Sequence, residues 1–114
     1  MMTDCLFCRI IRGEIPAKKA YEDDKVFAFH DINPQAPVHI LIVPKKHLAG
    51  LPQAQAEDAE VIGHSHLVAA GLGREHGIEH GYRTVYNVGP DSGQSVFHLH
   101  LHLIGGRKMA WPPG

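Results

Sequence analysis

Three histidines near the C-terminal end of the chain carry its strongest chemical signal. His98, His100 and His102 alternate with leucines, and Phe97 continues the apolar positions on the N-terminal side. Because a β-strand sends successive side chains to opposite faces, this alternation predicts a strand over residues 95–103 with one apolar face and one row of imidazoles. Each imidazole has two ring nitrogens that need partners, so imidazoles pack poorly in a core. We therefore expect a functional site on the histidine face.

The spacing of a strand limits what these histidines can do together. Residues two apart lie about 6.5–7 Å from each other, which puts His98 and His102 about 13 Å apart. One metal ion therefore cannot bind all three. The spacing favours a division of labour, in which one histidine is a nucleophile or base and another binds an anion. The alternative is an edge strand with solvated histidines, but histidine is neither a strong strand former nor a common surface residue at this density.

The composition narrows the class of protein. The 114 residues are enough for one domain with a modest core, and 44% of them are hydrophobic. Eleven Lys and Arg against twelve Asp and Glu give a net charge of −1, so we expect no field that attracts nucleic acid or an anionic membrane. The chain reaches Asp4 without a long apolar run, and no stretch has transmembrane length. We expect no secretory signal, no membrane span and a cytoplasmic location.

The only two cysteines, Cys5 and Cys8, lie three residues apart near the N-terminus. A disulfide that closes so short a loop would stabilise the protein little. In a cytosolic protein this spacing indicates a metal half-site or a redox pair. The plainer alternative is two half-buried thiols in a short helix.

The elements that must position these residues form a predicted α+β domain. We expect an antiparallel sheet of about five strands, with one short and one long helix. Asp4 is expected to cap the short helix and Gly13 to end it. The predicted helices cover residues 4–13 and 52–76, and the predicted strands cover 20–22, 25–30, 38–43, 82–88 and 95–103.

Two further features could take part in a site. The glycines of Gly89–Gln94 let backbone N–H groups approach a bound anion, and Gln94 and Ser95 add donors. Because this turn leads straight into the histidines, it predicts a phosphate-binding loop. His39 interrupts the most apolar predicted strand, where a lone histidine is as often a satisfied core residue as a ligand.

Taken together, these segments resemble a known family. The run His98–Leu103 is similar to the histidine-triad signature, in which histidine and hydrophobic residues alternate in a strand. Across nearly its whole length the chain resembles the Hint branch of that family, the histidine-triad nucleotide-binding proteins. The other segments that carry the resemblance are Phe29–His39, Pro44–His47, Asn87, Gly93–Ser95 and Trp111–Gly114.

The resemblance implies an activity and an assembly. It implies one domain over residues 1–114 and a homodimer whose two sheets join, with the C-terminal tail from about residue 105 contributing to the dimer. Each protomer would bind a purine nucleoside monophosphate. The reaction would be hydrolysis of the P–N bond of nucleoside 5′-phosphoramidates, such as AMP linked to an amine.

The resemblance also implies roles for single residues. By position, His100 would attack the α-phosphate and form a transient nucleotidyl-histidine. His102, His39 and Ser95 would hold the phosphoryl oxygens and move the proton of the leaving amine. Asp31 would bind the ribose hydroxyls. The remaining nucleotide-binding positions are Phe7, Ile10, Phe29 and Ile32 at the base, with His30, Asn87, Gly93 and Gln94.

A metal site is the last implication of the resemblance. In some bacterial relatives and in related nucleotidyltransferases, zinc is bound by a Cys-x-x-Cys pair and two histidines. The matching residues here are Cys5, Cys8, His47 and His98. Two thiolates and two imidazoles suit tetrahedral zinc. We expect such an ion to be structural, and we expect no catalytic metal.

Three other functions stay open. A metallohydrolase would use the histidines to hold a catalytic zinc ion, which the strand spacing disfavours. A non-catalytic nucleotide-binding regulatory protein would use the same pocket without turnover. A dinucleoside polyphosphate hydrolase would stay within the family, although the ending Trp111–Gly114 favours the phosphoramidase branch. His102, where the family's transferases commonly carry glutamine, argues against a nucleotidyltransferase.

Overall fold

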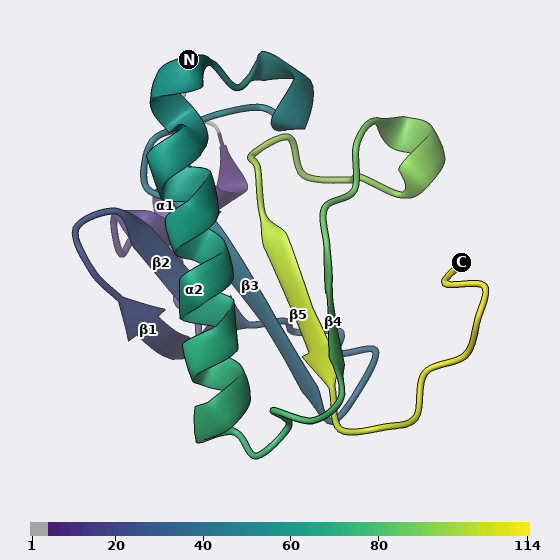
Figure 1. Ribbon diagram of the computed structural model, residues 1–114. Coiled ribbons are helices and arrows are strands. Elements are labelled where there is room, and N and C mark those ends of the chain that lie inside the picture. Colours follow the sequence, from purple (N-terminus) through teal and green to yellow (C-terminus); the bar gives the residue numbers. More distant parts are fainter. Residues whose placement is uncertain (1–4) are drawn as a thin grey trace.

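One antiparallel sheet of five strands organises the chain, and a long helix crosses one of its faces (Figure 1). The computed structural model describes residues 5–114. The strand order is β1-β2-β3-β5-β4, and all neighbouring strands are antiparallel, as predicted for this α+β domain. Within the described residues, none of the helices is long and apolar enough to span a membrane. The elements are α1 (Leu6–Ile11), β1 (Lys19–Glu22), β2 (Val26–His30), β3 (Val38–Pro44), α2 (Ala59–Glu75), β4 (Tyr82–Val85) and β5 (Leu101–Gly105).

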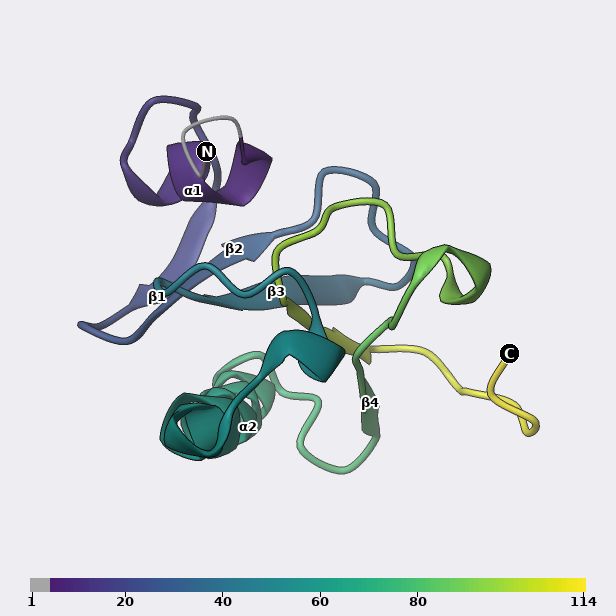
Figure 2. The same cartoon turned by 90° about the horizontal axis from the view of Figure 1, so that it is seen from above.

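The two faces of the sheet pack against different helices. Alternate residues of the central strands, such as Ile40 and Leu103, are fully buried against α2. The opposite face packs Phe29 and Leu41 against Phe7 of α1. Seen from above, α2 lies on one side of the sheet and α1 on the other (Figure 2). The sheet therefore separates a core on the α2 face from a face on which α1 covers part of the surface.

The short helix α1 begins where a side chain satisfies one of its first backbone N–H groups. In α1 this residue is Cys5, whose Sγ accepts the N–H of Cys8 at 3.5 Å. The predicted cap, Asp4, lies outside the described residues, and Gly13 follows the helix with a φ of +77°. The long helix begins at Ala59, later than predicted, because short 3₁₀ turns occupy Leu51–Gln53 and Ala56–Asp58.

The strand predicted over residues 95–103 is wrong in its first half. It begins only at Leu101, and Phe97, expected on the core face, is 50% exposed. The register pairs Ile42 with Leu101, so the next inward-facing pair would set Leu99 against Pro44. Proline has no N–H to donate to a sheet. The N–H of Leu99 instead donates to the carbonyl of Leu48 at 2.6 Å, and the segment before β5 leaves the ladder.

Burial under α2 predicts which leucines hold the fold together. We expect Leu103→Ala, at a fully buried position, to lower the free energy of unfolding by about 2–5 kcal/mol. The matched control is Leu67→Ala on α2, where the side chain is 73% exposed, and its effect should stay within about 0.5 kcal/mol. Urea denaturation measures both. Equal losses for the two variants would contradict this assignment of the core.

Candidate active site

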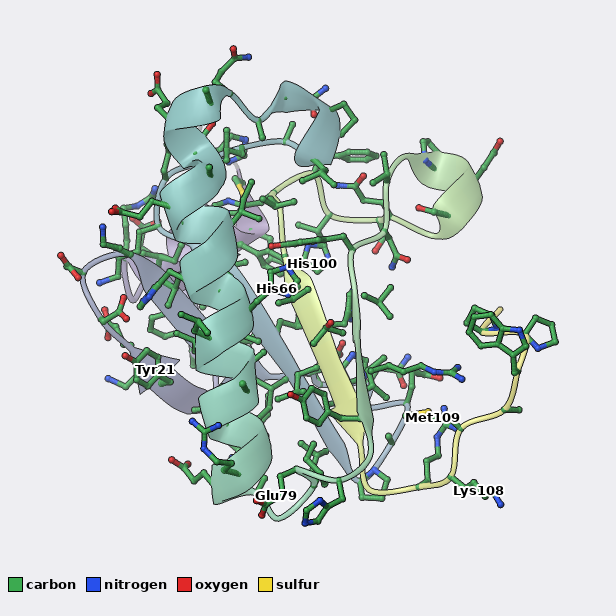
Figure 3. The ribbon with its side chains drawn as sticks, viewed as in Figure 1. Tyr21, His66, Glu79, His100, Lys108 and Met109 are labelled. Atoms are coloured by element: carbon green, nitrogen blue, oxygen red, sulfur yellow. The ribbon has the colours of Figure 1, made fainter. Side chains whose placement is uncertain are left out.

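Histidines from β3, from β5 and from the segment before β5 come together on the α1 face, and Figure 3 labels one of them, His100. His98 and His100 belong to the irregular segment before β5, whereas His102 lies on the strand itself. His39 lies on β3, with its ring centroid 5.2 Å from that of His102. The rings of His100 and His102 are 4.9 Å apart. The structure thus brings His39 into the histidine cluster, a placement that the sequence left open.

A backbone carbonyl fixes the protonation pattern of His100. Its Nδ1 lies 2.7 Å from the carbonyl oxygen of His98. Because a carbonyl oxygen only accepts hydrogen bonds, Nδ1 must carry the proton and donate it. A neutral ring then has its lone pair on Nε2. His100 therefore presents a nucleophilic nitrogen whose orientation is set by the main chain.

The pair His39–His102 has the opposite pattern. The backbone N–H of Gln35 donates to Nδ1 of His39 at 3.0 Å, so the proton of the neutral His39 ring is on Nε2. This Nε2–H donates to Nδ1 of His102 at 2.9 Å. Because Nδ1 of His102 accepts this hydrogen bond, the single N–H of the neutral His102 ring is on Nε2. That atom is buried and has no partner among the described residues, so it is a donor that lacks an acceptor.

Burial keeps these rings neutral. Desolvation lowers the pKa of His102 to about 4, with smaller contributions from His100 and His39. Desolvation also lowers the pKa of His39, against the opposing effect of Asp31, and lowers the pKa of His100. Neutral rings leave one lone pair and one N–H on each imidazole, which is the condition for the two patterns above.

Aromatic side chains enclose the cluster on the α1 side. The ring of Phe7 stands perpendicular to that of His100, with centroids 5.0 Å apart, and lies 5.4 Å from the ring of Phe29. Phe7, Ile10 and Phe29 are all buried in the α1–sheet cluster. Three of the predicted base-binding positions thus lie together next to His100. The fourth, Ile32, is 99% exposed on the loop after β2.

Two predicted nucleotide-binding side chains lie differently from what we expected. Gln94 is buried, and its amide is used within the chain: its Nε2 donates to the Ala49 carbonyl at 2.9 Å, and its Oε1 accepts the Gly89 N–H at 2.9 Å. It therefore braces the glycine-rich turn. The ring of His30 lies on the α2 face, 5.7 Å from that of His76, because its neighbour in the ladder, Ile40, faces α2.

The other predicted residues lie around the cluster. Asp31 places Oδ2 3.4 Å from Nε2 of His39, and its Oδ1 accepts the N–H of Asn33. Ser95 is exposed in the segment that leads to His98, and Asn87 is partly buried after β4. Gly93 has a φ of +97°, a conformation that glycine adopts without strain.

The residues predicted to bind zinc form a second cluster, which includes His98 and adjoins the candidate active site. Its closest contacts are Cys5 Sγ to His98 Nδ1 and Cys8 Sγ to His47 Nδ1, both 3.4 Å, and the two Nδ1 atoms lie 3.1 Å apart. One ligand atom from each residue lies within 4.8 Å of the others. Around tetrahedral zinc, neighbouring sulfur and nitrogen ligands are about 3.3–3.8 Å apart. The four residues therefore fit a structural zinc ion.

The orientation of His98 supports this fit, and the environment of Cys8 sets a condition on metal binding. Nε2 of His98 donates to the carbonyl of Pro44 at 2.8 Å, which leaves the lone pair of Nδ1 toward the cluster, as metal-bound histidines require. Desolvation, together with Cys5, raises the pKa of Cys8 to about 11. A thiol in that environment carries its proton at neutral pH until a cation displaces it.

A second group of possible ligand atoms, from Asp31, His39 and His102, does not fit a metal ion. A cation there would need the lone pair of His39 Nε2. The Gln35 N–H already occupies the other ring nitrogen, so Nε2 holds the proton. The hydrogen bonds of His39 thus argue against a metallohydrolase that uses these residues.

Several groups that shape the site could not be found from residue types. The carbonyls of Pro44 and Leu48 and the N–H of Gln35 are backbone atoms, which the side-chain pattern does not report. The one usable signal was Pro44 itself, because a proline at the end of a central strand predicts that pairing stops there.

The fold and the site agree with what the chain is similar to. The HIT domain model matches residues 12–109, and the chain belongs to this family. It is 53% identical over 114 residues to an uncharacterized HIT-like protein of Synechococcus elongatus, with all of both chains covered. It is 52% identical to a 14 kDa zinc-binding protein of Zea mays, over 96% of this chain and 87% of the maize protein.

Solved structures that superpose on this chain belong to the same family. A HIT family hydrolase from Legionella pneumophila superposes with a TM-score of 0.95 at 49% identity, covering 97% of this chain and 100% of that one. A histidine triad nucleotide-binding protein from Candida albicans has a TM-score of 0.82 at 33% identity, over 96% of this chain and 83% of its own. The chain therefore has the fold of a family that includes hydrolases and nucleotide-binding proteins.

The cysteine–histidine cluster predicts a metal content. Protein purified without chelators should contain about one zinc ion per chain, and Cys8→Ser should lose most of it. His80→Ala, at an exposed position outside the cluster, is the control and should keep its zinc. Elemental analysis measures the ion, and cobalt substitution reports tetrahedral thiolate coordination by its visible spectrum. Equal zinc content in the three proteins would contradict the site.

The pKa of His102 predicts a pH dependence of stability. The unfolded ring takes up a proton near 6.5, but the folded ring does so only at about 4. Its contribution to stability is therefore complete above pH 6.5 and is lost as the pH falls toward 4. When the pH falls from 7.5 to 5, the free energy of unfolding of His102→Gln should decrease by about 1–2 kcal/mol less than that of wild type. Urea denaturation at the two pH values measures this difference. An NMR titration of folded His102 centred near 6.5 would contradict this.

Proposed function

We propose that the protein hydrolyses the P–N bond of purine nucleoside 5′-phosphoramidates, such as AMP linked to an amine. One observation supports this above others: a lone pair on Nε2 of His100 lies beside an unpartnered N–H on Nε2 of His102. The first group can attack phosphorus, and the second can bind a phosphoryl oxygen, which only accepts. This pair of complementary nitrogens suits phosphoryl transfer without a metal.

The reaction proceeds in two displacements. In the first, Nε2 of His100 forms a bond to the α-phosphorus, and the bond from phosphorus to the amine breaks. The amine nitrogen keeps the electron pair and takes up one proton, which Nε2–H of His102 donates. In the second, water attacks phosphorus, the bond to His100 breaks, and its electron pair returns to Nε2. Water thus supplies the oxygen of the released nucleotide and restores the proton that the amine took.

Neighbouring groups hold the substrate in this geometry. His102, supported by His39, binds the phosphoryl oxygens together with Ser95, and Asn87 and the N–H groups near Gly93 line the phosphate end. Asp31 binds the ribose hydroxyls on the loop after β2. The base lies at the apolar wall made by Phe7, Ile10 and Phe29, of which Phe7 contacts His100, with Ile32 exposed on the loop after β2. Such in-line positioning is most of what phosphoryl transfer requires of a protein.

We also propose that two protomers assemble through β4. This strand is an edge of the sheet, so its outer backbone groups are free to pair with a second copy. Beside it, the chain end at residues 111–114 and the outer side of β4 line an open groove of about 570 Å³. Trp111 is 82% exposed there, with the Arg83 guanidinium 5.8 Å from its ring. A second β4 would join the two sheets and cover this tryptophan.

Replacing the proposed nucleophile should separate binding from chemistry. We expect His100→Ala to bind AMP but to lose turnover of a fluorogenic adenosine phosphoramidate by about 10³-fold or more. His66→Ala, an exposed histidine on α2, is the control and should keep wild-type turnover (Figure 3). Wild-type turnover by His100→Ala would contradict the proposal. If wild type binds AMP but turns over no phosphoramidate, a regulatory nucleotide-binding protein is favoured. If it turns over only diadenosine polyphosphates, a dinucleoside polyphosphate hydrolase is favoured.

A further inference from the structure

Gln35 is held on both sides, by His39 of the proposed active site and by Arg107, which the proposed reaction does not use. Its N–H donates to Nδ1 of His39 at 3.0 Å, and its carbonyl accepts Nε–H of Arg107 at 3.0 Å. Arg107 follows the end of β5, and the preceding Gly106 packs against Pro37 so closely that an added Cβ would lie 3.0 Å from the proline Cβ. The turn after β5 therefore clamps the loop that carries Gln35.

The hydrogen bond from the Gln35 N–H to His39 decides which ring donates and which accepts in the hydrogen bond between His39 and His102. With a backbone donor on Nδ1, His39 can only donate from Nε2, and His102 can only accept at Nδ1 and donate from Nε2. The reverse direction would put a proton on Nδ1 of His39, where it would face the N–H of Gln35. Two donors would then meet at 3.0 Å, and one hydrogen bond would be lost. The loop thus allows only one of the two directions.

We propose that Arg107 is a positioning residue that acts through Gln35, and that the clamp makes His102 a hydrogen-bond donor of fixed direction. The clamp selects the chemical class of group that His102 can bind. An N–H on Nε2 matches an oxygen that only accepts, such as a phosphoryl oxygen, and rejects the N–H of an amine. The inference rests on the proposed function only in assigning that oxygen to the nucleotide.

The direction can be read without any substrate. In ¹⁵N-labelled protein at neutral pH, long-range ¹H–¹⁵N correlations distinguish a protonated ring nitrogen from one with a lone pair. We expect His39 and His102 to have the proton on Nε2, and His100 to have it on Nδ1, which gives an internal reference of the opposite pattern. A proton on Nδ1 of His39 would overturn the inference, whatever the protein hydrolyses.

Variants test whether the clamp causes this pattern. Arg107→Met should move the ring nitrogen shifts of His39 and His102 toward averaged values and weaken AMP binding by about 3–10-fold, with His100 unchanged. Arg74→Met, an exposed arginine on α2, is the matched control and should change neither. Unchanged shifts and AMP affinity in Arg107→Met would overturn the role of Arg107.

A second pair of variants tests the backbone donor itself. Gln35→Pro removes the N–H, whereas Gln35→Ala keeps it and loses only the side chain, which donates to the carbonyl of Asn33. The proline variant should lose the fixed pattern on His39, and the alanine variant should keep it. If Gln35→Pro does not fold, the Arg107→Met result decides. If wild type has the expected protons on Nε2 of His39 and His102 but turns over no phosphoramidate, the inference about the clamp holds and the proposed function is refuted.

Discussion

Three polar groups of His98 each contact a different part of the structure. Its Nδ1 faces the cysteine–histidine cluster, its Nε2–H donates to the Pro44 carbonyl, and its own carbonyl accepts the proton of His100. One residue thus connects the zinc ligands, the end of β3 and the proposed nucleophile. Any shift of His98 would disturb all three contacts, so the structural metal site and the candidate active site depend on the same fixed segment.

That segment has to leave the sheet to do this. If the pairing with β3 continued past Leu101, Leu99 would face Pro44, which has no N–H to donate to the Leu99 carbonyl. The pairing stops there, the segment before β5 bends out of the ladder, and in this bend the His98 carbonyl accepts the Nδ1–H of His100. The nearby His39–His102 pair depends on a backbone group as well. Main-chain atoms therefore assign opposite proton positions to two adjacent rings of the same residue type.

Residue patterns predicted the helices and strands, and the family resemblance predicted which four residues lie together at the zinc site. Neither predicted where the backbone departs from regular structure. The α+β class, the five antiparallel strands and the union of Cys5 and Cys8 with His47 and His98 are confirmed. Periodicity could not show that the histidine strand begins at Leu101, since the alternation of residue types continues where the backbone bends. Nor could it show that Gln94 turns inward, because residue type says nothing of which acceptors lie nearby.

The covalent intermediate tests the central claim most directly. Wild-type protein mixed with an adenosine 5′-phosphoramidate and quenched in alkali, in which a nucleotidyl-histidine survives, should show a mass increase of one adenylyl group. Peptide mapping should place that group on His100, and His100→Ala should show none under the same conditions. An adenylyl group on another residue, or hydrolysis by wild type with no adduct at any time after mixing, would contradict the account.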